Sequence, residues 1–203
     1  MNSQLKSVLD IICQDYQLEA KWLHTLSLLE FIGARKIAKT MALHHPSSNV
    51  LDHFADETRH ASIFKQLSQQ LFATNEYLAE NAAKTYMKKL DTQLCDWLDG
   101  IYPEATTQDK YLLVTTMIEE RAMVVYPLYR KYSRDRQIQT ELRKIIKEEA
   151  SHQEVIKNAT CHMLLPFHHE KLEGPMALEE QCFAEFLSTL DRELSITCNQ
   201  RQH

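Results

Sequence analysis

Residues 141–164 read ELRKIIKEEASHQEVIKNATCHML, and they are the most informative segment about the fold. Apolar side chains recur in this segment at steps of three and four residues, which places them on one face of an α-helix. Glu149 and His152 interrupt that face, and residues three apart lie on the same side of a helix. A buried carboxylate is costly unless it is paired or binds a metal ion. The segment therefore predicts a core-facing helix that carries a metal-binding pair.

A second Glu-x-x-His pair, Glu57 and His60, lies on or beside an apolar stripe in a helix predicted over 48–73. The number of pairs carries little weight, because a chain with 10 His and many Glu contains such a pair by chance. Their placement carries the interpretation, since solvated charges do not belong on a stripe that faces the core.

Each pair also has a lone glutamate upstream on another apolar stripe. Glu30 precedes Glu57 by 27 residues, and Glu119 precedes Glu149 by 30 residues. The sequence is therefore interpreted as a helical hairpin used twice, in which each half supplies one lone Glu and one Glu-x-x-His pair.

The third-helix ligand is ambiguous between Glu119 and Glu120. If Arg121 is placed in solvent, Glu119 lies about 160° from it around the helix and Glu120 only about 100°. Glu119 also shares a face with Tyr126, seven residues on. We therefore prefer Glu119.

Other polar residues near the pairs have two interpretations each. His53, four residues before Glu57, is either a third imidazole of the site or, as is commoner, a partly buried structural histidine. Tyr126 is either a partner of a ligand or a core tyrosine. Asp56 and Glu148 directly precede the paired glutamates and are interpreted as solvated groups or as partners of the ligands.

The chain has only 3 Gly and 5 Pro in 203 residues, which favours long helices over a turn-rich β fold. The predicted helices cover about 4–43 (with a break near its start), 48–73, 76–99, 107–132, 133 or 135–164, and 174–197. Short links join the first two long helices and the third and fourth, whereas a helical crossover separates the pairs. We expect one all-α domain over 1–203: a ferritin-like four-helix bundle with a helical crossover and an extra C-terminal helix.

Four Glu and two His that face inward from four helices form the ligand set of di-iron and di-manganese carboxylate bundles. The candidate metal ligands are Glu30, Glu57, His60, Glu119, Glu149 and His152. Hard carboxylate oxygens and imidazoles suit two iron ions, with manganese or a mixed pair as alternatives.

On these residues the chain resembles the ferritin-like superfamily over nearly its whole length, and within it the bacterial di-iron tRNA hydroxylases. Ile118-Glu119-Glu120-Arg121 is similar to the family's I-E-A-R segment, and Glu149-Ala150-Ser151-His152 is similar to its E-A-R-H segment. Met123-Val124-Val125-Tyr126 stands where the family usually has Cys-Glu-Arg-Phe. The resemblance implies the same six ligands.

The expected function is that of an enzyme, an O₂-activating di-iron oxidoreductase of the hydroxylase or monooxygenase kind. Its partners would be O₂ or peroxide, an electron-donor protein, and an organic substrate that is a small molecule or a modified nucleotide. The first alternative is an iron oxidase or a rubrerythrin-like protein that removes peroxide. The second alternative is a non-enzymatic helical interaction protein.

Composition bears on the expected partners and cellular location of the protein. The net charge of −5 does not indicate a basic nucleic-acid-binding domain, and no run of 18 apolar residues predicts a membrane span. The five cysteines are scattered and form no C-x-x-C pair, which is typical of reduced thiols in the cytoplasm. The last helix is expected to pack on the bundle or to form a homodimer surface.

Overall fold

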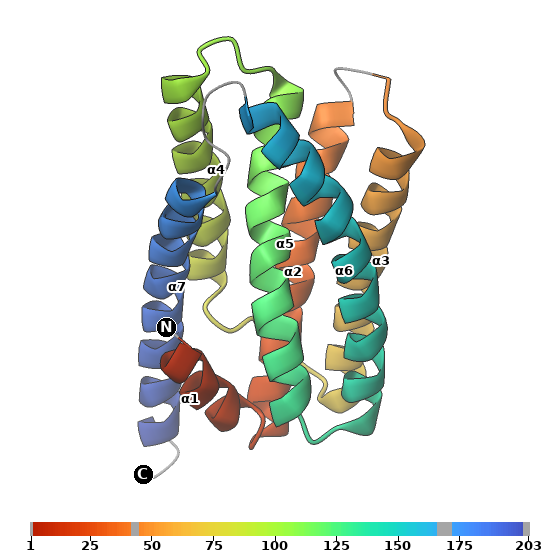
Figure 1. The fold of residues 1–203 in the computed structure, drawn as a ribbon. Helices are drawn as coiled ribbons and strands as arrows, with labels where there is room; N and C mark the ends of the chain where they lie inside the picture. The colour runs from red at the N-terminus through yellow and green to blue at the C-terminus, as the bar shows by residue number, and fades with distance from the viewer. Residues whose placement is uncertain (1, 42–44, 166–171, 201–203) are drawn as a thin grey trace.

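The computed structural model describes residues 2–41, 45–165 and 172–200, and these residues form helices and no strand. The prediction of an all-α protein is therefore confirmed. The helices, shown in Figure 1, are α1 (Asn2–Ile12), α2 (Tyr16–Met41), α3 (Ser48–Leu71), α4 (Glu80–Ile101), α5 (Thr107–Tyr132), α6 (Arg136–Leu164) and α7 (Glu173–Gln200). Residues 42 and 43, which the sequence assigns to the first long helix, lie outside the described residues.

Two antiparallel hairpins build the centre of the molecule. α2 pairs with α3 and α5 pairs with α6, while α2 also contacts α5 and α3 also contacts α6. α4 carries the chain back along the molecule, so α3 and α5 run in the same direction in Figure 1. α4 and α7 pack against each other and cover the side of the molecule formed by α2 and α5. This arrangement encloses the space between the two hairpins on the side that α4 and α7 cover.

Polar side chains fix the helix starts. Thr106 and Asp109 form a capping box at the start of α5, and the Asp135 carboxylate accepts hydrogen bonds from two amides in the first turn of α6. The Asp15 carboxylate does the same for α2. The predicted starts near residues 107 and 135 are therefore confirmed, and the expected early break falls at residues 13–15.

The crossover helix begins later than the predicted residue 76, because the preceding segment is held on α2. The Thr25 hydroxyl donates to the Leu78 carbonyl oxygen at 2.6 Å, and the Leu78 amide lies 3.0 Å from the same hydroxyl. Ala79 then adopts a left-handed conformation with φ of 54°, which a continuing helix does not allow. α4 therefore starts at Glu80.

The C-terminal helix is a packing element. Phe186, Leu187 and Leu190 of α7 are almost completely buried in one continuous core with Trp22 of α2. The cysteines with described side chains, Cys13, Cys95, Cys161 and Cys182, are free thiols. None of the helices in the described ranges has the length and apolar character needed to cross a membrane.

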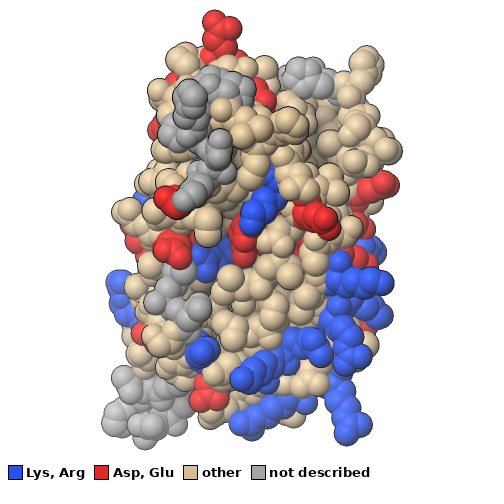
Figure 2. Space-filling model, viewed as in Figure 1, with Lys and Arg blue, Asp and Glu red and all other residues tan. Residues whose placement is uncertain are grey.

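Charge is unevenly distributed over the surface. Figure 2 shows basic side chains gathered over the end of α5 and the first half of α6, in the lower right of the view. The basic residues of this stretch are Arg130, Lys131, Arg134, Arg136, Arg143, Lys144 and Lys147, all exposed or half-exposed. The net charge of −5 therefore does not describe every face of the protein.

Candidate metal centre

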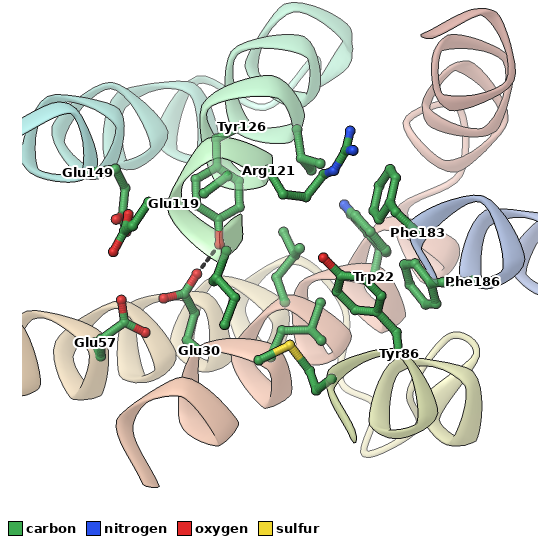
Figure 3. Close-up of a pocket in the computed structure, with 16 residues that line it drawn as sticks. Trp22, Glu30, Glu57, Tyr86, Glu119, Arg121, Tyr126, Glu149, Phe183 and Phe186 are labelled. Carbon is green, nitrogen blue, oxygen red and sulfur yellow. Dashed lines mark hydrogen bonds between the residues drawn. The ribbon is translucent and has the colours of Figure 1, made fainter. Parts of the chain in front are cut away.

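The four predicted glutamates meet between the two hairpins, one from each of α2, α3, α5 and α6. Glu30 and Glu57 are each 7% exposed, and Glu119 and Glu149 are each 2% exposed. Figure 3 shows the four carboxylates gathered at one end of a pocket. Four carboxylates in so enclosed a place require protons, cationic partners or metal ions to compensate their charge.

Both predicted histidines join this group. His60 Nδ1 lies 2.9 Å from Glu149 Oε1 and 3.6 Å from Glu30 Oε2. His152 Nδ1 lies 3.9 Å from Glu149 Oε2. The helical spacing of the two Glu-x-x-His pairs therefore brings each imidazole to the carboxylate cluster, as the sequence indicates.

His53 is a third imidazole at the same place. Its Nε2 atom lies 3.0 Å from Glu119 Oε1 and 3.3 Å from Glu57 Oε1, and the residue is 3% exposed. Its other ring nitrogen, Nδ1, shares a hydrogen bond of 2.9 Å with the Tyr111 hydroxyl. Tyr111 lies two four-residue steps before Glu119, a spacing on one helix face that the sequence already contains.

Together these side chains form two neighbouring groups that could each hold a metal ion. One group is His53, Glu119 and His152, and the other is Glu30, Glu57, His60 and Glu149. Within each group, one candidate ligand atom per residue lies within 4.8 Å of all the others. The contacts of Glu57 with His53 and of Glu149 with His152 connect the two groups.

Carboxylates hold the outward nitrogens of the paired histidines. His60 Nε2 lies 2.9 Å from Glu148 Oε2, and His152 Nε2 lies 3.0 Å from Asp56 Oδ2. Each carboxylate directly precedes a candidate ligand on the opposite helix. Arg59 bridges the two, because its Nη1 atom donates to Glu148 at 3.1 Å and its Nη2 atom contacts Asp56. Such partners fix the ring orientation of metal-bound histidines.

Four ligand atoms that face into the cluster, by contrast, lack a hydrogen-bond partner among the described residues. His53 Nε2, His60 Nδ1, His152 Nδ1 and Glu119 Oε2 are all buried without one among the described residues. The contacts described above are close approaches rather than hydrogen bonds, and that of His152 with Glu149 is too long for one. A ring-nitrogen lone pair and a carboxylate oxygen that face each other repel unless a cation or a proton lies between them. The donor set therefore fits metal ions.

The electrostatics of the cluster point the same way. Burial raises the pKa of Glu30 well above its usual value, and the negative charge of Glu57 raises it further. Burial and the negative charge of Glu149 have the same effect on the pKa of Glu119. Burial lowers the pKa of His60, but the carboxylates of Glu149 and Glu30 outweigh it and raise that pKa to about 11. Without metal, the cluster holds protons that a bound cation would displace.

Two further contacts shape the centre. The Tyr126 hydroxyl donates to Glu30 Oε1, so this tyrosine is a partner of a candidate ligand. A Cβ atom on Gly33 would lie 2.7 Å from Glu57 Oε2, so α2 leaves room for that carboxylate only because residue 33 is glycine.

The preference for Glu119 over Glu120 agrees with the structure, but one premise was wrong. Glu120 lies at the surface, where its carboxylate accepts from Lys157 Nζ at 2.5 Å. Arg121, expected in solvent, is only 9% exposed and donates from Nε to Glu179 Oε1 at 2.9 Å. Its guanidinium also lies 4.2 Å from the centre of the Phe183 ring. The acidic partner on α7 makes this burial favourable.

Two pockets reach the cluster from different directions. The apolar pocket, of about 60 Å³, extends in Figure 3 from the four glutamates to Trp22, Tyr86, Arg121, Phe183 and Phe186. The second pocket, of about 410 Å³, is lined by His53 and His152 together with Asn49, Asp52 and Gln108. Each of the two candidate ligand groups therefore has residues that line a recess.

Comparison of the chain with models of protein families, with curated proteins and with solved structures found no match.

Proposed function

We propose that this chain is a non-haem di-iron oxidoreductase that activates O₂ or peroxide to oxidise an organic substrate. In this proposal α2, α3, α5 and α6 form a ferritin-like four-helix bundle around the metal pair. The proposal rests chiefly on one observation: two adjacent groups of buried carboxylates and imidazoles, in which all three imidazoles and Glu119 each have a buried atom without a hydrogen-bond partner among the described residues.

The donor atoms suit this metal choice. One iron ion would be held by His53, Glu119 and His152, and the second by Glu30, Glu57, His60 and Glu149. Carboxylate oxygens and imidazole nitrogens are ligands that iron and manganese both accept, so a manganese or mixed pair remains an alternative. When bound, such a pair supplies the redox chemistry that amino-acid side chains lack.

The chain's own groups would orient the ligands and exclude water. Asp56 and Glu148 hold the outward nitrogens of the imidazoles, and the Tyr126 hydroxyl donates a hydrogen bond to Glu30 Oε1 and so orients that carboxylate. Burial shields the carboxylates from bulk water, which strengthens the electrostatic interactions of the cluster. Electrons would come from a donor protein.

Metal content tests the proposal directly. Protein purified without chelators and loaded with ferrous iron is expected to bind about two iron ions per chain, with spin coupling visible in Mössbauer spectra. Glu57→Ala and Glu149→Ala are each expected to lose at least one ion. Glu120→Ala is the matched control, because its carboxylate lies next to a candidate ligand but pairs with Lys157 at the surface. Two ions retained in both ligand variants would contradict the site.

The two pockets favour an enzyme with an organic substrate over the alternatives. An iron oxidase needs no apolar pocket beside the metals, and an interaction protein needs no enclosed cluster. Rapid peroxide turnover that no organic compound accelerates would move the assignment to a peroxide-removing protein.

A further inference from the structure

A third recess lies between α2, α4 and α5. This recess, the basic groove, has a volume of about 540 Å³. Its basic lining residues are Arg35, Lys36, Lys39, Lys84, Lys88 and Lys110, and its only lining carboxylate in the described residues is Asp91. A concave surface lined by one sign of charge raises the local concentration of the opposite ion.

Half of these basic side chains have acidic partners. Lys36 pairs with Asp91, Lys84 Nζ lies 2.6 Å from Glu80, and Lys110 Nζ lies 2.7 Å from Asp99. The positive charges of the other three basic lining residues are less compensated.

Arg35, Lys39 and Lys88 have no carboxylate within ion-pair distance in the described part of the chain. This local excess of positive charge stands out in a protein with a net charge of −5. The groove therefore offers a site for an anionic group, with three cations that have no carboxylate partner in the described residues, of which Arg35 also lies over the Phe31 ring.

The basic groove and the apolar pocket share a wall. Met87 of α4 and Ile118 of α5 line both recesses. Ile118 directly precedes the candidate ligand Glu119, and both residues line the apolar pocket, so the shared wall includes a residue next to the carboxylate cluster in the chain. Methionine is unbranched and adapts its shape readily, which suits a wall that admits a chain.

We propose that the basic groove and the apolar pocket together bind one amphipathic anion, with a phosphate head on Arg35, Lys39 and Lys88 and a short apolar chain that passes Met87 toward the glutamates. This anion would be the substrate that the metal centre oxidises, so the inference rests on the proposed function. The apolar continuation beyond the groove distinguishes such a ligand from a free phosphate ion. The concave shape favours a single dissolved molecule over a membrane surface.

Butyl phosphate, inorganic phosphate and 1-butanol test the two halves of the site on the metal-loaded protein. In calorimetric titrations, butyl phosphate is expected to bind at least about tenfold more tightly than either fragment, since burial of two methylene groups suffices for that factor. Trp22 lines the apolar pocket, and the chain has only 2 Trp. In a Trp97→Phe background, Trp22 fluorescence is expected to change with butyl phosphate but not with inorganic phosphate.

Charge reversal localises the head group. Lys39→Glu/Lys88→Glu is expected to weaken butyl phosphate binding at least about tenfold without changing metal content. The control Lys131→Glu/Arg143→Glu makes the same change in net charge at exposed sites outside the groove. It is expected to leave binding unchanged.

Three results would overturn the inference: equal affinity for butyl phosphate and inorganic phosphate, equal effects of the two double variants, or binding to anionic phospholipid vesicles without binding of dissolved butyl phosphate. Metal content is measured on the same samples and keeps the two proposals separate. A protein without iron that still binds butyl phosphate as described would retain the ligand site and lose the proposed function.

Discussion

His53 Nε2 lies 3.0 Å from Glu119 Oε1, and this contact gives the cluster a third imidazole. The two residues come from α3 and α5, which lie in different hairpins. His53 therefore joins the two halves of the site, as His60 of α3 also does through its contact with Glu149 of α6. The other ring nitrogen of His53 is fixed by the Tyr111 hydroxyl.

We predict that His53→Ala lowers the metal content from about two ions per chain to about one, because only three residues make up the group to which His53 belongs. Metal analysis after dialysis against metal-free buffer measures this loss. His162→Ala, at an exposed position of α6, is the control and is expected to keep both ions. Two tightly bound ions in His53→Ala would show that this histidine is only structural.

The carboxylates behind the imidazoles give a second prediction. Glu148→Gln and Asp56→Asn are each expected to lower metal affinity about 10- to 100-fold, the usual cost of losing such a partner of a metal-bound histidine. Competition with a chromophoric chelator measures the affinity. Arg59→Ala is expected to have a smaller effect, because its side chain is 43% exposed and solvent screens its ion pairs. A larger loss from Arg59→Ala than from the carboxylate variants would reverse this order.

Helical periodicity was sufficient to predict the six candidate ligands and their convergence. Glu30 and Glu119 were recognisable because each is an isolated acid on an apolar stripe, and a three-residue spacing fixes Glu149 and His152 on one face. These features depend only on residues close together in one helix, so they can be recognised in a single sequence.

Contacts between helices were not predictable in the same way. The Asp56 contact with His152 depends on the relative height of α3 and α6, which no local pattern specifies. The burial of Arg121 likewise depends on Glu179, 58 residues away in the chain. An arginine is placed in solvent by default, and only the tertiary structure reveals the partner that overrides this default.

The buried pair of Arg121 and Glu179 gives a third prediction. Arg121→Met leaves the Glu179 carboxylate buried without its partner and is expected to destabilise the fold by about 3–5 kcal/mol. Arg121→Met/Glu179→Gln is expected to recover most of that loss, because the amide still accepts from the Tyr86 hydroxyl. Urea unfolding of the metal-free proteins measures both values. Equal destabilisation in the single and double variants would contradict the argument.

His24 gives a pH prediction at a site remote from the cluster. Burial, together with Lys65, lowers the pKa of this histidine, whose Nδ1 atom lies 3.0 Å from the Glu76 carbonyl oxygen. The unfolded chain therefore binds a proton at His24 more readily than the folded protein does, and stability falls as the pH drops below about 6.5. His24→Phe removes this titration, so its unfolding free energy is expected to fall less between pH 7 and pH 5. Parallel curves for the two metal-free proteins would exclude the effect.

Gly33 gives a prediction in which stability and metal affinity move in opposite directions. A Cβ atom at this position would displace the Glu57 carboxylate, the flexible end of a side chain, rather than any backbone. Gly33→Ala is therefore expected to leave the metal-free fold as stable or to stabilise it by up to about 1 kcal/mol, since alanine is the better helix former. The same change is expected to lower metal affinity at least about tenfold, because it moves a candidate ligand.

Gly100→Ala separates these two effects. Gly100 also lies in a helix, but a Cβ atom there meets nothing within 4 Å. This control is expected to raise stability by a similar amount and to leave metal affinity unchanged. Thermal unfolding of the metal-free proteins and chelator competition of the loaded ones give the two quantities independently. If Gly33→Ala bound metal as tightly as Gly100→Ala, the Glu57 carboxylate would have to bind metal from another position or not at all, and the ligand group around Glu30 would need revision.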